Sequence, residues 1–159
     1  MSVSVGQTVP DFSAAATGDQ TVRLSEFRGR WVVLYFYPRD STPGCTVEGQ
    51  QFRDLYDRFA AANAVIFGVS RDSLRSHENF RAKHGFPFPL LADVDESLCH
   101  LFDVLKLKKL YGRESLGVER STFLIDENGV LRREWRKVKA DGHAAEVLAA
   151  VEALAGAAS

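Results

Sequence analysis

The chain has 159 residues, of which 45% are hydrophobic and 26% are charged. This is the composition of an ordinary globular protein, and it excludes a disordered chain and a membrane protein. The formal net charge is -1, so no strong positive field would attract the protein to nucleic acid or to anionic lipid.

The N-terminal residues 1–12 have neither the basic start nor the apolar run of a secretory signal. No apolar stretch approaches the ~20 residues that a membrane helix needs. We therefore expect a cytoplasmic protein with a single domain over residues 1–159. The two cysteines, Cys45 and Cys99, match neither a Cys-x-x-Cys motif nor a zinc spacing. The four histidines are scattered, so we expect no metal site.

The first third of the chain predicts a hairpin, a buried strand and a helix. Residues 12–16 and 21–24 are short β-type runs on either side of Gly18-Asp19, which favours a hairpin. Residues 31–37 (WVVLYFY) are apolar throughout, as in a strand that is buried on both faces. Beyond Pro43 the apolar residues recur with helical spacing, which predicts an amphipathic helix. This stripe consists of Phe52, Leu55, Tyr56 and Phe59.

The middle of the chain continues the alternation of strand and helix. Residues 64–69 predict a strand, Asp72 can cap a helix that ends at Gly85, and residues 89–92 predict a brief strand. A short helix is expected over residues 96–104. The basic residues that follow are interleaved with leucines, and we interpret this segment as a solvated loop without a function. They are Lys106, Lys108, Lys109 and Arg113.

The last third of the chain predicts a second hairpin and a closing helix. Residues 121–125 and 130–135 flank Asn128-Gly129, which is a strong hairpin signal. Apolar residues from Ala144 to Leu154 then recur with helical spacing. Alternating strands and helices, followed by an antiparallel hairpin and a helix, predict a three-layer α/β sandwich with a mixed central sheet.

Cys45 lies where a helix is expected to begin. Thr42 is a good N-cap and Pro43 suits the first helical position, so Cys45 falls in the first turn. Backbone N–H groups there lack intrahelical partners, and the positive helix end favours a nucleophilic thiolate. Pro43 and Gly44 support a small pocket, because glycine lets the backbone approach closely. From position alone, a small apolar residue buried at a helix start is an equal alternative.

The segment from Pro38 to Cys45 resembles the active-site motif of the peroxiredoxins, Pro-x-x-x-Thr-x-x-Cys. The longer run YPRDSTPGCTVE is similar to the PrxQ branch of that family, also called bacterioferritin comigratory protein. Segments along nearly the whole chain resemble the same branch: VPDF, LSEFRGRWVVLYFYP, GVSRDS, SHENF, FPLLAD, YGRESLGVERSTFLID and WRKVKADGH. The resemblance implies a thioredoxin-like fold with an N-terminal hairpin, and a peroxidase without metal, haem or flavin.

The resemblance also implies a role for each residue of the site. Cys45 corresponds to the peroxidatic cysteine, Thr42 to the hydroxyl that orients the peroxide, and Pro38 to the shield over the thiolate. Arg120 corresponds to the active-site cation, and we expect a parallel βα arrangement to bring it to the helix start. Glu48 would help to position this arginine; an exposed carboxylate favoured by the helix dipole is the alternative.

The chain departs from its family at the resolving cysteine. Many PrxQ proteins carry one five residues after the peroxidatic cysteine, where this chain has Gln50. Others carry it in the next helix, which is expected here over residues 73–84 and contains no cysteine. Cys99 is the remaining thiol, in a segment resembling a packed helix, which favours an inert core cysteine over a resolving one. We therefore expect one-cysteine recycling by glutathione with glutaredoxin, or by thioredoxin.

These residues predict an antioxidant enzyme that reduces hydrogen peroxide and organic hydroperoxides through a sulfenic acid on Cys45. A peroxide sensor or a holdase-type binding protein would keep the reactive thiol without fast turnover. A thiol-disulfide oxidoreductase would need Cys-x-x-Cys, but the residues after Cys45 are Thr46, Val47 and Glu48. The resemblance implies a monomer or a weak homodimer, and no nucleic-acid or membrane partner is expected.

Overall fold

The structure is a computed structural model, and it describes residues 2–157. The strands are β1 (Ser13–Ala16), β2 (Gln20–Arg23), β3 (Trp31–Phe36), β4 (Ala64–Ser70), β5 (Leu90–Ala92), β6 (Leu105–Leu110), β7 (Arg113–Val118), β8 (Ser121–Ile125) and β9 (Leu131–Trp135). The helices are α1 (Pro43–Asp54), α2 (Tyr56–Ala61), α3 (Leu74–His84), α4 (Ser97–Leu101) and α5 (His143–Ala157), with a 3-10 turn η1 over Leu24–Phe27.

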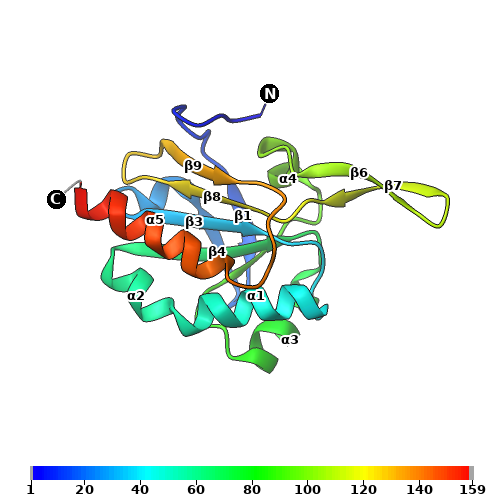
Figure 1. Ribbon diagram of the computed structural model, residues 1–159. Helices are drawn as coiled ribbons and strands as arrows, with labels where there is room; N and C mark the ends of the chain where they lie inside the picture. Colours follow the sequence, from blue (N-terminus) through cyan, green and yellow to red (C-terminus); the bar gives the residue numbers. More distant parts are fainter. Residues whose placement is uncertain (1, 158–159) are drawn as a thin grey trace.

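A mixed sheet of seven strands lies at the centre, in the order β2-β1-β5-β4-β3-β8-β9 (Figure 1). The inner strands β3, β4 and β5 are parallel, whereas β8 is antiparallel to β3 and β1 is antiparallel to β5. The hairpins β1-β2 and β8-β9 were both expected from their turn residues. The mixed sheet and the N-terminal hairpin confirm the predicted fold class.

Each face of the sheet packs against a core of its own. Successive side chains of a strand point in opposite directions, so one strand contributes to both cores. In β3, Trp31 and Tyr35 belong to the core shared with α1, α2, α3 and α5. Val32 and Phe36 belong to the core on the other face, which includes residues of α4 and η1. All six residues of β3 are buried, which confirms the strand predicted from its apolar run.

Two predicted helices differ in extent from the observed ones. The single helix expected after Pro43 is interrupted at Leu55, which separates α1 from α2. The helix expected over residues 96–104 is only the short α4. None of the helices in the part of the chain that the structure describes is long and apolar enough to cross a membrane.

The helix α3 begins one residue later than predicted, because Ser73 and not Asp72 is its N-cap. The Ser73 hydroxyl accepts a hydrogen bond from the Ser76 amide at 3.2 Å. The Asp72 carboxylate is engaged elsewhere, since it accepts a bond from the Asp40 amide at 2.9 Å. At the other end Gly85 has a φ of 63°, a left-handed conformation that glycine adopts without a steric penalty.

The basic segment interpreted as a loop is instead a hairpin, and that prediction was wrong. Strands β6 and β7 pair antiparallel, with Leu105 opposite Val118 at the base. From Leu105 to Lys108 leucine alternates with lysine, which is the period-two pattern of a strand. The turn residues Tyr111 and Gly112 have φ values of 52° and 75°, as a type I′ turn requires. Tyr-Gly lacks the usual Asn or Asp of such turns, so the turn signal is weak.

Candidate active site

Cys45 lies in the first turn of α1, as predicted. Thr42 is the N-cap and Pro43 is the first residue of the helix. The chain reaches this helix from the carboxyl end of β3 through the half-buried Pro38. Cys45 is 2% exposed and belongs to the core cluster on the α1 side of the sheet. The sulfur is therefore close to the amide groups of a helix start and shielded from bulk solvent.

The Thr42 side chain does not cap the helix, although the residue occupies the cap position. Its hydroxyl donates a hydrogen bond to the Arg39 carbonyl at 2.8 Å. Its backbone carbonyl accepts bonds from the Thr46 amide at 2.9 Å and from the Thr46 hydroxyl at 2.8 Å. Because the hydroxyl proton is used locally, the lone pairs of the Thr42 oxygen remain to accept a further donor.

Arg120 meets Cys45 although 75 positions separate them in the sequence. Its Nη2 donates to the Cys45 sulfur at 3.4 Å, and its Nη1 donates to Oε1 of Glu48 at 2.7 Å. The predicted parallel arrangement was wrong, because β8 runs antiparallel to β3 with Ser121 opposite Phe36. The beginning of β8 therefore lies beside the end of β3, where the chain turns toward α1.

Glu48 is fully buried, so it is not the exposed carboxylate that the sequence left open. Burial raises the pKa of Glu48 to about 7, against the opposing effect of the Arg120 guanidinium. Burial also opposes the charge of Arg120, but Glu48 and Cys45 outweigh it and raise the pKa of Arg120. The arginine thus stays charged, while Glu48 gains or loses its proton near neutral pH.

Gly44 leaves room for the arginine beside the thiol. A Cβ atom on Gly44 would lie 3.1 Å from Nη2 of Arg120, which is too close for the guanidinium to keep its place. Arg120 also borders a cavity of about 430 Å³, whose lining includes Pro38 and Val138. The cavity thus borders two of the predicted site residues, Pro38 and Arg120.

A buried polar network that the sequence analysis missed holds the loop between β3 and α1. The Asp40 carboxylate accepts bonds from the Tyr37 hydroxyl at 2.6 Å and from the Ser76 hydroxyl at 2.8 Å. It also lies 2.7 Å from Nδ1 of His77. The other ring nitrogen of His77 donates to the Leu91 carbonyl at 2.9 Å, since a carbonyl can only accept. These bonds tie the loop to α3 and β5.

Asp40, Asp72 and His77 each offer a ligand atom, and these atoms lie within 4.8 Å of one another. The scattered histidines of the sequence did not predict such a cluster, because Asp40 and His77 are 37 positions apart and follow no spacing motif. Hydrogen bonds inside the network account for the close approach of the three side chains.

Cys99 lies on the opposite face of the central sheet from Cys45. It is fully buried in α4 and belongs to the core cluster that includes Phe36, whereas Cys45 belongs to the other cluster. The Cys99 amide donates to the Asp93 carboxylate at 2.8 Å. Burial, and then the nearby Asp93, raise the pKa of the Cys99 thiol well above its usual range. The sheet thus separates the two sulfur atoms.

A buried thiol in the first turn of a helix, hydrogen-bonded to an arginine from the neighbouring sheet, is the arrangement of a thiol-dependent peroxidase. The chain belongs to the AhpC/TSA family, whose model matches residues 5–134. Within that family it is a member of the peroxiredoxin Bcp/PrxQ subfamily. It is 51% identical to peroxiredoxin Bcp of Bacillus subtilis over 148 residues, 93% of this chain and 94% of the relative.

Two solved structures support the same assignment. Xanthomonas campestris peroxiredoxin Q superposes with a TM-score of 0.87 at 53% identity, covering 91% of both chains. A mutant of Xylella fastidiosa PrxQ superposes with a TM-score of 0.92 at 43% identity, covering 98% of this chain and 99% of that one. These relatives confirm the predicted family and the thioredoxin-like fold, and the chain is therefore a thiol peroxidase.

Proposed function

We propose that this chain reduces hydrogen peroxide and organic hydroperoxides with Cys45 as the peroxidatic residue. The observation that carries the proposal is the 3.4 Å contact between Nη2 of Arg120 and the Cys45 sulfur in the first turn of α1. A solved structure of Xanthomonas campestris bacterioferritin comigratory protein, 52% identical to this chain, is described by its alkyl peroxide reduction activity. This description supports the same class of substrate here.

In the proposed reaction the Cys45 thiolate attacks one peroxide oxygen in line with the O–O bond. The S–O bond forms as the O–O bond breaks, and the bonding electron pair moves to the departing oxygen. That oxygen takes up a proton and leaves as water or an alcohol, and Cys45 becomes a sulfenic acid. The charged guanidinium of Arg120 stabilises the negative charge that moves from sulfur to the leaving oxygen.

The neighbouring residues position the peroxide and the guanidinium. The Thr42 oxygen accepts a hydrogen bond from the hydroperoxide, because its own proton is donated to the Arg39 carbonyl. Glu48 fixes the Arg120 guanidinium through the 2.7 Å bond to Nη1. Pro38 shields the thiolate from water. Pro43 starts the helix and Gly44 admits the guanidinium, so both support the pocket.

We also propose that an outside thiol recycles the enzyme, with thioredoxin, or glutathione and glutaredoxin, as the donor. A thiol attacks the Cys45 sulfenic acid, which expels water and forms a mixed disulfide, and a second thiol then releases Cys45. The position of Cys99 across the sheet supports this route over an internal disulfide. Thiol donors require a reducing compartment such as the cytoplasm, and the enzyme would act as a monomer or weak homodimer.

The central test is peroxide reduction by the Cys45→Ser variant in a stopped-flow experiment. We expect no enzymatic consumption of peroxide, because the serine hydroxyl is not ionised at neutral pH. The matched control is Cys99→Ser, which should react like the parent protein. Wild-type turnover by Cys45→Ser would contradict the proposal. A parent protein that reacts no faster than free cysteine would instead indicate a sensor.

Intact mass after one equivalent of peroxide tests the recycling route. The gain of one oxygen indicates a sulfenic acid that waits for an outside thiol, which is the expected result. The loss of two hydrogens would indicate a disulfide between Cys45 and Cys99, and a dimer mass would indicate a disulfide between two copies. Either of the last two results would contradict one-cysteine recycling.

A further inference from the structure

Asp40 lies in the loop that joins β3 to α1, between two residues of the proposed site, and the peroxidase reaction leaves it without a role. Pro38 precedes it by two positions and Thr42 follows it by two positions. Asp40 is only 6% exposed, although aspartates are mostly exposed in proteins. Burial of a carboxylate is costly unless several donors satisfy it. The donors that satisfy Asp40 therefore decide where this loop lies.

The residue after Asp40 has an unusual backbone conformation. Ser41 has a φ of 63° and is exposed. A left-handed φ is uncommon for a residue other than glycine, and it persists only where the surrounding structure holds it. Thr42 follows directly, and its hydroxyl donates to the Arg39 carbonyl at 2.8 Å. The direction of the Thr42 hydroxyl thus depends on the turn at Ser41.

The bonds that hold this loop come from α3 and from the segment before it. The Ser76 hydroxyl donates to the Asp40 carboxylate at 2.8 Å, and Nδ1 of His77 lies 2.7 Å from the same oxygen. The Asp40 amide donates to the Asp72 carboxylate at 2.9 Å. Both the side chain and the backbone of Asp40 are therefore bonded to residues 72–77.

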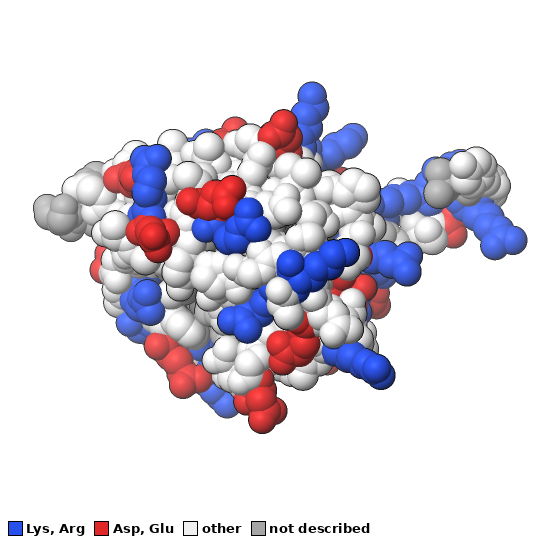
Figure 2. Space-filling model, turned by 90° about the horizontal axis from the view of Figure 1, so that it is seen from below, with Lys and Arg blue, Asp and Glu red and all other residues white. Residues whose placement is uncertain are grey.

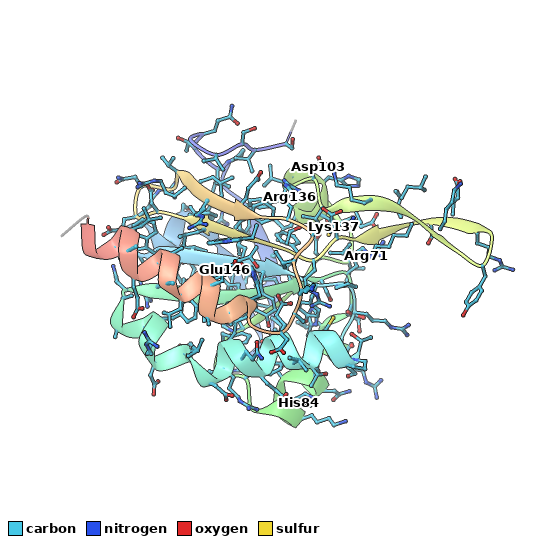
Figure 3. The ribbon with its side chains drawn as sticks, in the orientation of Figure 1. Arg71, His84, Asp103, Arg136, Lys137 and Glu146 are labelled. Atoms are coloured by element: carbon cyan, nitrogen blue, oxygen red, sulfur yellow. The ribbon has the colours of Figure 1, made fainter. Side chains whose placement is uncertain are left out.

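The anchoring segment is itself fixed on more than one side. Arg71 directly precedes Asp72 and donates to the Glu96 carboxylate at 2.9 Å. Figure 3 shows Arg71 on the side of the molecule from which the hairpin β6-β7 projects. The Ser70 hydroxyl donates to the Asp72 carboxylate. The segment therefore cannot follow a movement of the loop without loss of these bonds.

Asp40 and His77 share a proton inside the protein. Nε2 of His77 must carry a hydrogen, because it faces the Leu91 carbonyl at 2.9 Å. An attractive contact between Nδ1 and the Asp40 carboxylate then requires a second proton between these two atoms. The Tyr37 hydroxyl donates to the other carboxylate oxygen at 2.6 Å, and burial raises the pKa of Tyr37 well above its ordinary value. Each oxygen of Asp40 thus has a partner.

Surface charge does not explain why the two side chains meet. Figure 2 shows basic and acidic side chains intermixed on the face that α1, α2 and α3 form. Exposed charges are screened by solvent, whereas His77 is 0% exposed. The internal hydrogen bonds therefore hold Asp40 and His77 together.

We propose that His77 is a positioning residue for the peroxide step, and that it acts through Asp40 on the loop between β3 and α1. This inference rests on the proposed roles of Cys45 and Thr42. The pair of Asp40 and His77 holds the left-handed turn at Ser41, so the Thr42 oxygen is in place before the hydroperoxide binds. Groups that are already oriented need no rearrangement at the moment of reaction.

The first test replaces His77 by alanine and compares two reactions of Cys45. Single-turnover stopped-flow kinetics measure oxidation by hydrogen peroxide, and peptide mass measures alkylation by iodoacetamide. Oxidation needs the Thr42 oxygen to place the peroxide, whereas alkylation needs only an accessible thiolate. We expect His77→Ala to lower the peroxide rate constant by about 10-fold. The alkylation rate should stay within about 2-fold of the parent value.

Rescue by glycine tests whether the effect passes through Ser41. Glycine adopts a left-handed φ without a steric penalty, so Ser41→Gly no longer needs the pair to hold the turn. Added to His77→Ala, it should return the peroxide rate constant to within about 3-fold of the parent value. The matched control is Asp19→Gly in the same background, since Asp19 is exposed and has a φ of 54° in the turn between β1 and β2. This control should restore nothing.

Ser76→Ala is a milder variant that serves where His77→Ala does not fold. It removes one donor of Asp40 from a half-buried position in α3, and alanine is the best helix former. We expect the peroxide rate constant to fall by about 3-fold, with an unchanged alkylation rate and with rescue by Ser41→Gly. Circular dichroism shows which variants are folded.

Three results would overturn the positioning role. The first is a folded His77→Ala protein, or Ser76→Ala in its place, that keeps the parent rate with peroxide. The second is a change of the peroxide and alkylation rates by the same factor, which would show a general loosening of the site. The third is an equal effect of Ser41→Gly and Asp19→Gly. All three leave the proposed peroxidase function in place, whereas a parent protein that does not consume peroxide would contradict that function itself.

Discussion

The two cysteines are almost equally buried, but the charges around them differ in sign. Cys45 is 2% exposed and accepts a hydrogen bond from the Arg120 guanidinium at the start of α1. Cys99 is 0% exposed, and burial together with the nearby Asp93 carboxylate raises the pKa of its thiol. Because the exposed fractions of the two thiols hardly differ, we expect the sign of the nearby charge to make Cys45 the more reactive of the two.

Removing the Arg120 guanidinium should have the largest effect on the difference in reactivity that we expect between Cys45 and Cys99. Arg120→Ala takes away the donor that faces the Cys45 sulfur, and we expect the rate constant for peroxide to fall about 100- to 1000-fold. Stopped-flow kinetics under single-turnover conditions measure this step without recycling. Arg136→Ala is a control that removes an arginine outside the site. An unchanged rate in Arg120→Ala would remove the arginine from the mechanism.

Selective alkylation tests directly, in the native protein, whether the Cys45 and Cys99 thiols differ in reactivity. Iodoacetamide reacts with thiolates, and the raised pKa of the Cys99 thiol leaves almost none of it ionised. We expect Cys45 to be labelled at least about 100-fold faster than Cys99, as measured by peptide mass after digestion. In denaturant the two rates should converge. Comparable labelling of both cysteines in the folded protein would contradict the assigned difference.

Cys99→Ser should affect stability but leave the peroxide step unchanged. A serine hydroxyl at this fully buried site replaces a weakly polar thiol inside an apolar cluster, which we expect to cost about 1–3 kcal/mol in the free energy of unfolding. Urea denaturation measures this cost, and stopped-flow kinetics measure the peroxide step. A large loss of peroxidase rate in a folded Cys99→Ser protein would show that the two faces are coupled.

Glu48→Gln should give the smallest effect on the peroxide rate constant, and it should change only the pH dependence of that constant. Above pH about 7 Glu48 is ionised and pairs with Arg120, whereas below it the carboxyl is protonated and this pairing weakens. We expect the peroxide rate constant to fall several-fold between about pH 8 and about pH 6, with a component near 7 that Glu48→Gln lacks. A pH profile identical in both proteins would exclude Glu48 as its source.

The same substitution makes a second prediction about stability. The pKa of Glu48 in the folded state lies above its ordinary value of 4.5, so the folded protein binds this proton more tightly than the unfolded chain does. Stability should therefore decrease as the pH rises from about 4.5 to about 7. Glu48→Gln should remove this decrease, which urea denaturation at several pH values can measure.

Local signals in the sequence were sufficient for most of the fold. The apolar run of β3, the Asn128-Gly129 turn between β8 and β9, and the Gly85 end of α3 were all predicted, because each depends on neighbouring residues alone. The hairpin β6-β7 was missed, since the outer residues of its two strands are exposed and Tyr111-Gly112 is an unusual turn pair. The Asp40–His77 contact was missed because no sequence spacing encodes it.

The sequence by itself determined the thiol at a helix start, the absence of a cysteine at both usual resolving positions, and the family. These depend on local motifs, which can be recognised in the amino-acid sequence alone. Only the tertiary structure decided that Arg120 reaches Cys45 through an antiparallel strand, that Glu48 is buried, and that Cys99 lies behind the sheet. Such facts depend on strand register and on which face a side chain takes, and both are set by packing between distant segments.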